Sequence, residues 1–454
     1  MSGLVEKAGF SADLRSRLTG GFLLNLVGAA CNQGSTLAVN VLVSNLYGPK
    51  VFGEYAAIQA TIATGAAIAS FGTGYTTTKY VAELRSADPQ RASRILGLCA
   101  GVACVTALIM TAILFGGASW IAERSLHASR LAPGLRIASC AIFFNVLNWY
   151  LMGGLSGLEA YRSLARAGVV SGAAYLVLCS LGTWLGGLEG TLAGVALSAA
   201  FQTLVLLVFL TREARNQGLR IQLADAWTER NVLWRFAVPS ALPGFTTMPA
   251  IWIANLVLLR QPDGYAQLGF YSAAYNFRTM TVFLPSVLAS VSMAVLNNQI
   301  RAGEANRYWA VFRLSIAMTG VVTLAVALFF ALTGRPLLRI FGPSYDRAYI
   351  PLLILLAGSI VEAMWTIVAQ VLSSRERMWS LLLFCTFPRD ALLVVLAFVF
   401  VPRLESTGLA LAYALSWIAG LALAVGIARR SGSLGLESSP SHGARIPNGG
   451  EKRA

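Results

Sequence analysis

Twelve apolar stretches of about 20 residues follow one another along this chain of 454 residues. A helix of about this length crosses the hydrocarbon core of a bilayer, where the backbone finds no hydrogen-bonding partner outside its own segment. We therefore expect an all-α polytopic membrane protein with twelve transmembrane helices. The stretches are residues 20–44, 55–76, 95–120, 137–155, 167–185, 190–210, 236–259, 270–296, 314–333, 350–372, 379–401 and 407–428.

Composition and charge exclude several other classes of protein. Only 12% of the residues are charged and 56% are hydrophobic, whereas about a quarter are charged in a soluble domain. The net charge is +15, but the basic residues lie between the apolar stretches and form no Lys/Arg-rich module. We therefore expect membrane lipids around the chain and no nucleic acid as partner.

The distribution of Lys and Arg predicts the orientation. Of the 35 basic residues, 24 lie at the termini and in the connections on the same side as the termini, and nine lie in the opposite connections. Basic connections stay in the cytoplasm, so both termini are expected there.

A short motif occurs twice. Residues 48–57 and residues 264–273 both fit Gly-x4-Gly-x-Tyr-x-Ala, and they are 216 residues apart. A chance match in a Gly- and Ala-rich chain is one reading. The other is duplication of a six-span unit, since each copy follows the first span of its half. Duplication predicts two six-helix lobes of the same orientation around a central cavity.

This pattern divides the chain into five parts. They are a cytoplasmic N-terminal segment (1–19), an N-lobe (20–210), a cytoplasmic inter-lobe linker (211–235), a C-lobe (236–428) and a disordered cytoplasmic tail (429–454).

Polar residues inside the spans are candidates for a substrate cavity, because lipid-facing surfaces exclude them. Hydrogen bonding between helices is the alternative explanation for about half of them. The candidates with amide side chains are Asn25, Asn32, Asn145, Asn148 and Asn255.

Arg278 is the most informative residue of the eighth span. Tyr271 and Tyr275 share its helical face, and an aromatic face beside a guanidinium suits a sugar linked to a phosphate. Two other readings stay open. Arg278 pairs with Glu362 or Asp390, or its side chain extends to the membrane interface.

Three further charged residues lie inside spans, namely Glu362, Arg389 and Asp390. They suggest either coupling to a proton or sodium gradient or ion pairing. Arg389 and Asp390 point about 100° apart on a helix and need not pair with each other. The six cysteines form no CxxC motif and there are only two histidines, so we expect no metal, no cofactor and no catalytic residue.

Two segments carry a resemblance to a known family. Leu46-Tyr47-Gly48-Pro49-Lys50-Val51-Phe52-Gly53-Glu54-Tyr55 looks like the Leu-Gly-Pro-x-x-Phe-Gly-x-Tyr signature of bacterial polysaccharide-transport flippases. Gln267-Leu268-Gly269-Phe270-Tyr271-Ser272-Ala273-Ala274-Tyr275, followed by Phe283-Leu284-Pro285, is similar to the second-half signature of the same family. With the twelve spans, the resemblance covers nearly the whole chain.

The resemblance implies the fold of the multidrug/oligosaccharidyl-lipid/polysaccharide (MOP) exporter superfamily. It implies a multi-pass protein of the bacterial inner membrane that flips an undecaprenyl-pyrophosphate-linked oligosaccharide to the periplasmic leaflet by alternating access. The product would be O-antigen, capsule or exopolysaccharide, and a polymerase and a chain-length regulator would be partners. Many members have an acidic residue in span 7, where this chain reads Trp252-Ile253-Ala254-Asn255. That difference weakens any ion-coupling role at this position.

Two alternative functions remain. A drug or metabolite exporter of the same superfamily would be expected to carry carboxylates inside the first lobe, which has none mid-span. A membrane-embedded polysaccharide polymerase would need a large extracytoplasmic loop or a buried His or Asp. Since the longest outside loop has only about 16 residues, we expect no enzyme activity.

Overall fold

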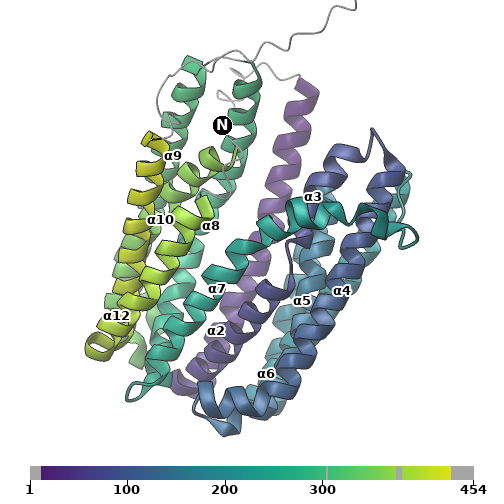
Figure 1. The fold of residues 1–454 in the computed structure, drawn as a ribbon. Helices are drawn as coiled ribbons and strands as arrows, with labels where there is room; N and C mark the ends of the chain where they lie inside the picture. Colours follow the sequence, from purple (N-terminus) through teal and green to yellow (C-terminus); the bar gives the residue numbers. More distant parts are fainter. Residues whose placement is uncertain (1–11, 303–304, 375–380, 431–454) are drawn as a thin grey trace, which may run out of the picture.

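The computed structural model describes residues 12–302, 305–374 and 381–430 (Figure 1). These residues are almost entirely helical and include no β-strand, which confirms the all-α prediction. Residues 1–11 and 431–454, which contain most of the predicted N-terminal segment and tail, lie outside the described residues.

Ten long helices are described. Those of the first half are α2 (Ala12–Ala69), α3 (Thr73–Leu84), α4 (Pro89–Trp120), α5 (Ala132–Gly157) and α6 (Tyr161–Asn216). Those of the second half are α7 (Val238–Leu259), α8 (Gly264–Ala302), α9 (Ala305–Arg339), α10 (Tyr349–Ser374) and α12 (Phe387–Arg430). Short 3-10 or π turns connect them: η1 (Ile121–Ser125), η2 (Ser129–Leu131), η3 (Ala226–Glu229), η4 (Leu233–Ala237), η5 (Pro343–Ala348) and η6 (Leu382–Thr386).

Three of the helices are about twice as long as a membrane span, and each breaks near its middle. The breaks are at Gly48 in α2, at Gly186 and Gly187 in α6, and at Glu405 in α12. In α6 and α12 the two arms run back along each other, since Gly182 touches Gly190 and Phe400 touches Gly408. Breaks of this kind explain how one continuous helix contains two predicted spans.

By length and hydropathy, seven helices of the described chain qualify as membrane spans, or eight when the bent pair α2 and α3 is counted as one. The twelve predicted spans exceed this number mainly because α2, α6 and α12 each contain two of them. All twelve fall on helix within the described residues apart from the turn at residues 70–72 in the second, and residues 379–380 of the eleventh lie outside the described residues.

The helix boundaries repeat along the chain. Helices α5 and α10 both have 26 residues and begin 217 residues apart, at Ala132 and Tyr349. The breaks at Gly187 (φ 58°, ψ −135°) and Glu405 (φ 49°, ψ −126°) have nearly the same backbone geometry. The structure therefore supports duplication of a six-span unit, as the repeated motif suggested.

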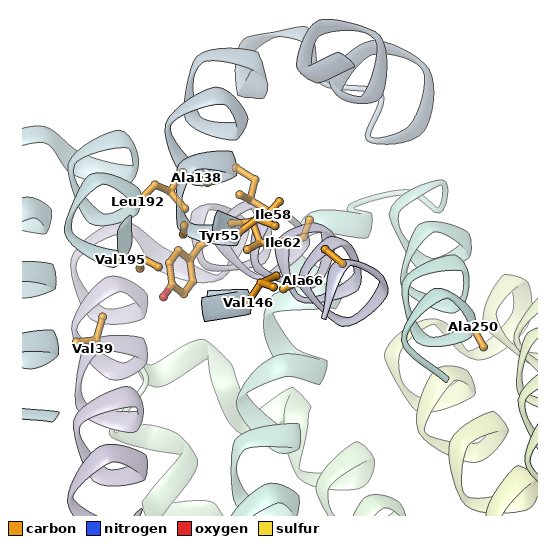
Figure 2. Close-up of a cluster of buried hydrophobic side chains, with 14 of the residues drawn as sticks. Val39, Tyr55, Ile58, Ile62, Ala66, Ala138, Val146, Leu192, Val195 and Ala250 are labelled. Carbon is orange, nitrogen blue, oxygen red and sulfur yellow. The ribbon is translucent and has the colours of Figure 1, made fainter. Parts of the chain in front are cut away.

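The first-half helices pack together as one lobe and the second-half helices as another, with α2 and α7 between them (Figure 1). In the first lobe, Tyr55, Ile58 and Ile62 of α2 meet Val146 of α5 and Leu192 of α6 (Figure 2). Small residues bring helices close elsewhere: a Cβ on Gly28 would lie 2.7 Å from the carbonyl oxygen of Ala165. Close approach of this kind suits a bilayer, where packing rather than the hydrophobic effect holds helices together.

The connection between the lobes is attached to the first one. The Gln222 amide donates to the Ser93 carbonyl at 3.3 Å, and Glu229 accepts from both Arg91 (3.0 Å) and Arg94 (3.3 Å). Lys79 lies 4.3 Å from the ring centre of Phe236, just before α7 begins.

Candidate functional site

The two copies of the repeated motif contact each other where the lobes meet. Gly53 of the first copy lies against the backbone of Tyr265 and Gly269, and Gly269 of the second copy lies against the backbone of Pro49. Neither glycine has room for a Cβ. The motif is thus repeated because two backbone segments, one from each lobe, must approach each other closely.

Aromatic and polar contacts surround these glycines. The Phe52 ring lies 5.9 Å from Phe341, and the Phe270 ring lies 5.3 Å from Tyr345. The Tyr265 hydroxyl donates to the Leu126 carbonyl at 2.6 Å. Arg130 and Glu54 form an ion pair in the same region. We call this set the lobe seal, defined as Phe52, Gly53, Glu54, Arg130, Tyr265, Gly269, Phe270, Phe341 and Tyr345.

Burial along α2 is uneven. Near the lobe seal, Val43 and Ser44 are buried, and the Ser44 hydroxyl donates to the Phe341 carbonyl at 2.8 Å. One turn earlier, Asn40 donates to the Asn276 side chain at 2.9 Å. Asn32 and Val27 are exposed, Val27 by 53%. The described side chains of α2 are therefore buried against the second lobe near Gly48 and more exposed toward Val27.

Arg278 lies inside the second lobe. Its guanidinium forms an ion pair with Glu362 of α10, and its Nη1 donates to the Tyr275 hydroxyl at 3.3 Å. Both Arg278 and Glu362 are only 8% exposed. Glu362 also accepts from the Tyr413 hydroxyl. Of the two carboxylates considered as partners from the sequence, the structure pairs Glu362 with Arg278.

A second buried pair lies nearby in α12. Arg389 contacts Asp390 through Nε (2.9 Å) and Nη2 (2.6 Å), although the two residues are adjacent. The long arginine side chain folds back onto its neighbour, so the 100° between them does not prevent pairing. Thr247 of α7 donates to Asp390 at 2.8 Å and accepts from Arg389 at 3.0 Å.

Aromatic rings join the two pairs into one cluster. The Tyr413 ring lies 6.2 Å from Tyr275 and 6.1 Å from Trp417. The guanidinium of Arg389 lies 4.1 Å from the Trp417 ring centre and 5.1 Å from that of Trp365. A guanidinium over an indole is stabilised by the negative face of the ring. We call this cluster the charged core, defined as Tyr271, Tyr275, Arg278, Glu362, Trp365, Arg389, Asp390, Tyr413 and Trp417.

The remaining candidates do not gather in one place. Asn148 is buried in the first lobe, where it donates to the Ala199 carbonyl (3.2 Å) and accepts from Thr203 (2.9 Å). Interhelical hydrogen bonding, the alternative explanation, accounts for these contacts. Asn145 and Asn255 are half-buried, Asn32 is exposed, and the Asn25 side chain lies outside the described residues. A substrate-facing role for the candidates stays a prediction.

Sequence reasoning did not identify Trp365, Tyr413 and Trp417. A signal was present, because Tyr413 and Trp417 are four residues apart and Trp365 follows Glu362 by three. These spacings place each pair on one helical face. Aromatic residues are common in membrane helices, so the pattern becomes informative only once α10 and α12 are known to pack together.

Comparison with known proteins agrees with this architecture. Residues 18–297 match the family model described as "Polysaccharide biosynthesis protein". The chain is 25% identical over 370 residues to the EPS I polysaccharide export inner membrane protein EpsE of Ralstonia nicotianae, covering 79% of this chain and 81% of the relative.

Solved structures share the fold at low sequence identity. An inward-facing multidrug resistance MATE family transporter of the MOP superfamily matches with a TM-score of 0.72 and 17% identity, over 91% of this chain and all of that one. A MOP superfamily transporter from Pyrococcus furiosus matches with a TM-score of 0.71 and 17% identity, over 92% and 96% of the two chains. The chain is therefore a multi-pass membrane protein that belongs to the polysaccharide biosynthesis protein family and shares the fold of the MOP superfamily transporters.

Proposed function

We propose that this transporter flips an undecaprenyl-pyrophosphate-linked oligosaccharide from the cytoplasmic to the periplasmic leaflet, for synthesis of O-antigen, capsule or exopolysaccharide. The family description and the polysaccharide export named for the Ralstonia relative support this substrate class. The transporter performs no bond-breaking chemistry in this scheme. A polysaccharide polymerase and a chain-length regulator would act on the flipped product.

The uneven closure of the lobe interface is the observation that carries the proposal. A transporter that works by alternating access closes its substrate path at one end while the other end is uncovered. Here the lobe seal closes the Gly48 end, and α2 is exposed toward its N-terminal end. The basic residues predict that both termini lie in the cytoplasm. The sealed end then faces the periplasm, and the uncovered end faces the cytoplasmic leaflet that holds the lipid-linked oligosaccharide.

Cross-linking the lobes beside the seal tests this scheme. Asn40 and Asn276, which hydrogen bond across the interface, are replaced by cysteine in a protein whose exposed Cys31 and Cys140 are serine. The protein is reconstituted into vesicles with the lipid-linked oligosaccharide, and a membrane-impermeant glycosidase reports flipping. A short cross-linker with two thiol-reactive groups should stop flipping by the double variant and leave each single-cysteine variant active. Unchanged flipping after complete cross-linking would rule out opening at this end.

The proposal also includes coupling to a proton or sodium gradient through Glu362. Glu362 contacts both Arg278 and Tyr413, so a change in its charge would alter contacts between α8, α10 and α12. Glu362→Gln should then remove the dependence of flipping on the imposed gradient while normal amounts of protein reach the membrane. A Glu362→Gln protein that responds to each gradient as the unmodified protein does would exclude this residue from coupling.

A further inference from the structure

A pocket of about 460 Å³ lies at the start of α6, outside the lobe seal and the charged core. It is lined by Val27 of α2 and by five residues from the first three turns of α6. These are Arg162, Ala165, Arg166, Val169 and Val170. The volume is within the range of small-molecule sites, about 300–1,000 Å³.

The two arginines of this pocket are available to a ligand. Arg162 and Arg166 are both exposed, and one helical turn separates them, so they project from the same face of α6. Within the described residues neither forms an ion pair. Glu159, the nearest acidic residue in sequence, pairs with Arg85 at 2.7 Å, and Glu213 accepts from Ser163 at 2.6 Å.

The pocket has a charged end and an apolar end. Arg162 and Arg166 precede the predicted membrane span 167–185, whereas Val169 and Val170 lie inside it. The pocket is thus lined by two cationic side chains and, beside them, by apolar residues of α2 and α6. A ligand that fits has an anionic head and an apolar chain.

Two guanidinium groups favour a head with two phosphates. Each guanidinium presents a planar set of donors that binds phosphate oxygens in pairs. Two of them on adjacent turns match two linked phosphoryl groups better than the single phosphate of a common phospholipid.

We propose that this pocket binds the pyrophosphate head of the polyprenyl-linked substrate in the cytoplasmic leaflet, with Arg162 and Arg166 on the phosphates and the valines on the first isoprene units. The proposal rests on the flippase function proposed above. It assigns the site where the substrate is first held, separate from the lobe seal. A phospholipid head is the competing source of the same phosphate chemistry.

Binding of undecaprenyl pyrophosphate to the purified transporter in nanodiscs, followed by native mass spectrometry, tests the proposal. The Arg162→Gln/Arg166→Gln variant should bind at least about tenfold more weakly, since each charge-assisted contact with phosphate corresponds to about a tenfold change. The matched control is Arg212→Gln/Arg215→Gln, which removes two exposed arginines from the other end of the same helix. It should bind normally. The Arg162→Lys/Arg166→Lys variant should retain part of the affinity.

Three results would overturn the assignment. These are equal loss of binding in the control variant, unchanged binding in the Arg162→Gln/Arg166→Gln variant, and displacement of the pyrophosphate by an equal amount of phosphatidylglycerol. Flipping measured in parallel separates this inference from the proposed function. If the unmodified protein flips substrate and the Arg162→Gln/Arg166→Gln variant does so equally well, only the docking pocket is wrong. If the unmodified protein flips nothing, the flippase function itself is wrong.

Discussion

The interiors of the two lobes differ although their helices correspond. With the spacing of 216 residues between the repeated motifs, Arg278 corresponds to Ile62. With the spacing of 217 between α5 and α10, Glu362 corresponds to Asn145. Ile62 belongs to the apolar cluster of Figure 2, whereas Arg278 belongs to the charged core. The corresponding helices match in length and in the geometry of their breaks, and the second lobe has paired charges at positions where the first is apolar or neutral.

The cost of buried charge explains why the charged residues occur together. A single charged residue at membrane depth costs roughly 2.5–3.5 kcal/mol on insertion scales. Arg278 and Arg389 each have a carboxylate partner and aromatic neighbours within the same lobe. The first lobe instead satisfies its buried Asn148 with Thr203 and a backbone carbonyl. The second lobe is thus the part of the described chain in which protonation or ion binding would have the largest structural effect.

The largest expected effect on stability comes from placing an arginine in the first lobe at Ile62, the position that corresponds to Arg278. Ile62 is 2% exposed and belongs to the apolar cluster of the first lobe. Ile62→Arg should destabilise the protein by about 3–5 kcal/mol or more, as an unpaired buried charge does. Fluorescence-detected size-exclusion chromatography of the solubilised protein should show little folded material. Adding Asn145→Glu should recover part of it. A stable Ile62→Arg protein would contradict the correspondence of the lobe interiors.

Removing the charge from the second lobe should have a slightly smaller effect. Arg278→Ala leaves Glu362 buried without its partner and should cost about 3–5 kcal/mol. Replacing both residues, as Arg278→Leu/Glu362→Leu, should restore folded protein, because no unpaired charge remains. The thermal stability of the detergent-solubilised variants measures both outcomes. If Arg278→Ala is as stable as the unmodified protein, the pair does not hold the second lobe together.

Removing the hydrogen bonds of Asn148 in the first lobe should lower the stability by a smaller amount. Asn148→Leu removes hydrogen bonds to α6, and interhelical bonds of this kind contribute about 0.6–1.7 kcal/mol in membranes. We expect a small fall in melting temperature and normal flipping. A loss of flipping with the melting temperature preserved would instead place Asn148 in the substrate path.

The paired helix breaks should respond with opposite signs in the two lobes. Glu405 has a positive φ that side chains adopt at a cost of about 1–3 kcal/mol, whereas Gly187 has nearly the same geometry at no such cost. Glu405→Gly should therefore raise the melting temperature, and Gly187→Ala should lower it. Shifts of the same sign for both variants would show that the two breaks are not equivalent.

The sequence was sufficient to predict the all-α fold, and it suggested the duplication that the helix boundaries support. These features follow from local patterns such as the length of apolar stretches and the spacing of glycines. The contacts of Arg278 were harder to predict, because Glu362 and Asp390 were both available and only the packing of α8 on α10 selects one. Asn32 and Asn40 illustrate the same limit. They are eight residues apart and lie near the same face of α2, yet Asn40 is bonded to Asn276 and Asn32 is exposed.

The anchoring of the connection between the lobes has a mechanical consequence. Phe236 is held against the first lobe, and Thr247, eleven residues later, is held by Arg389 and Asp390 in the second. Pro239 and Pro243 lie between these two anchors, and a proline inside a helix has no amide hydrogen to bond the preceding turn. In the alternating access proposed above, any rotation of one lobe against the other would therefore bend the beginning of α7, which joins the two anchors.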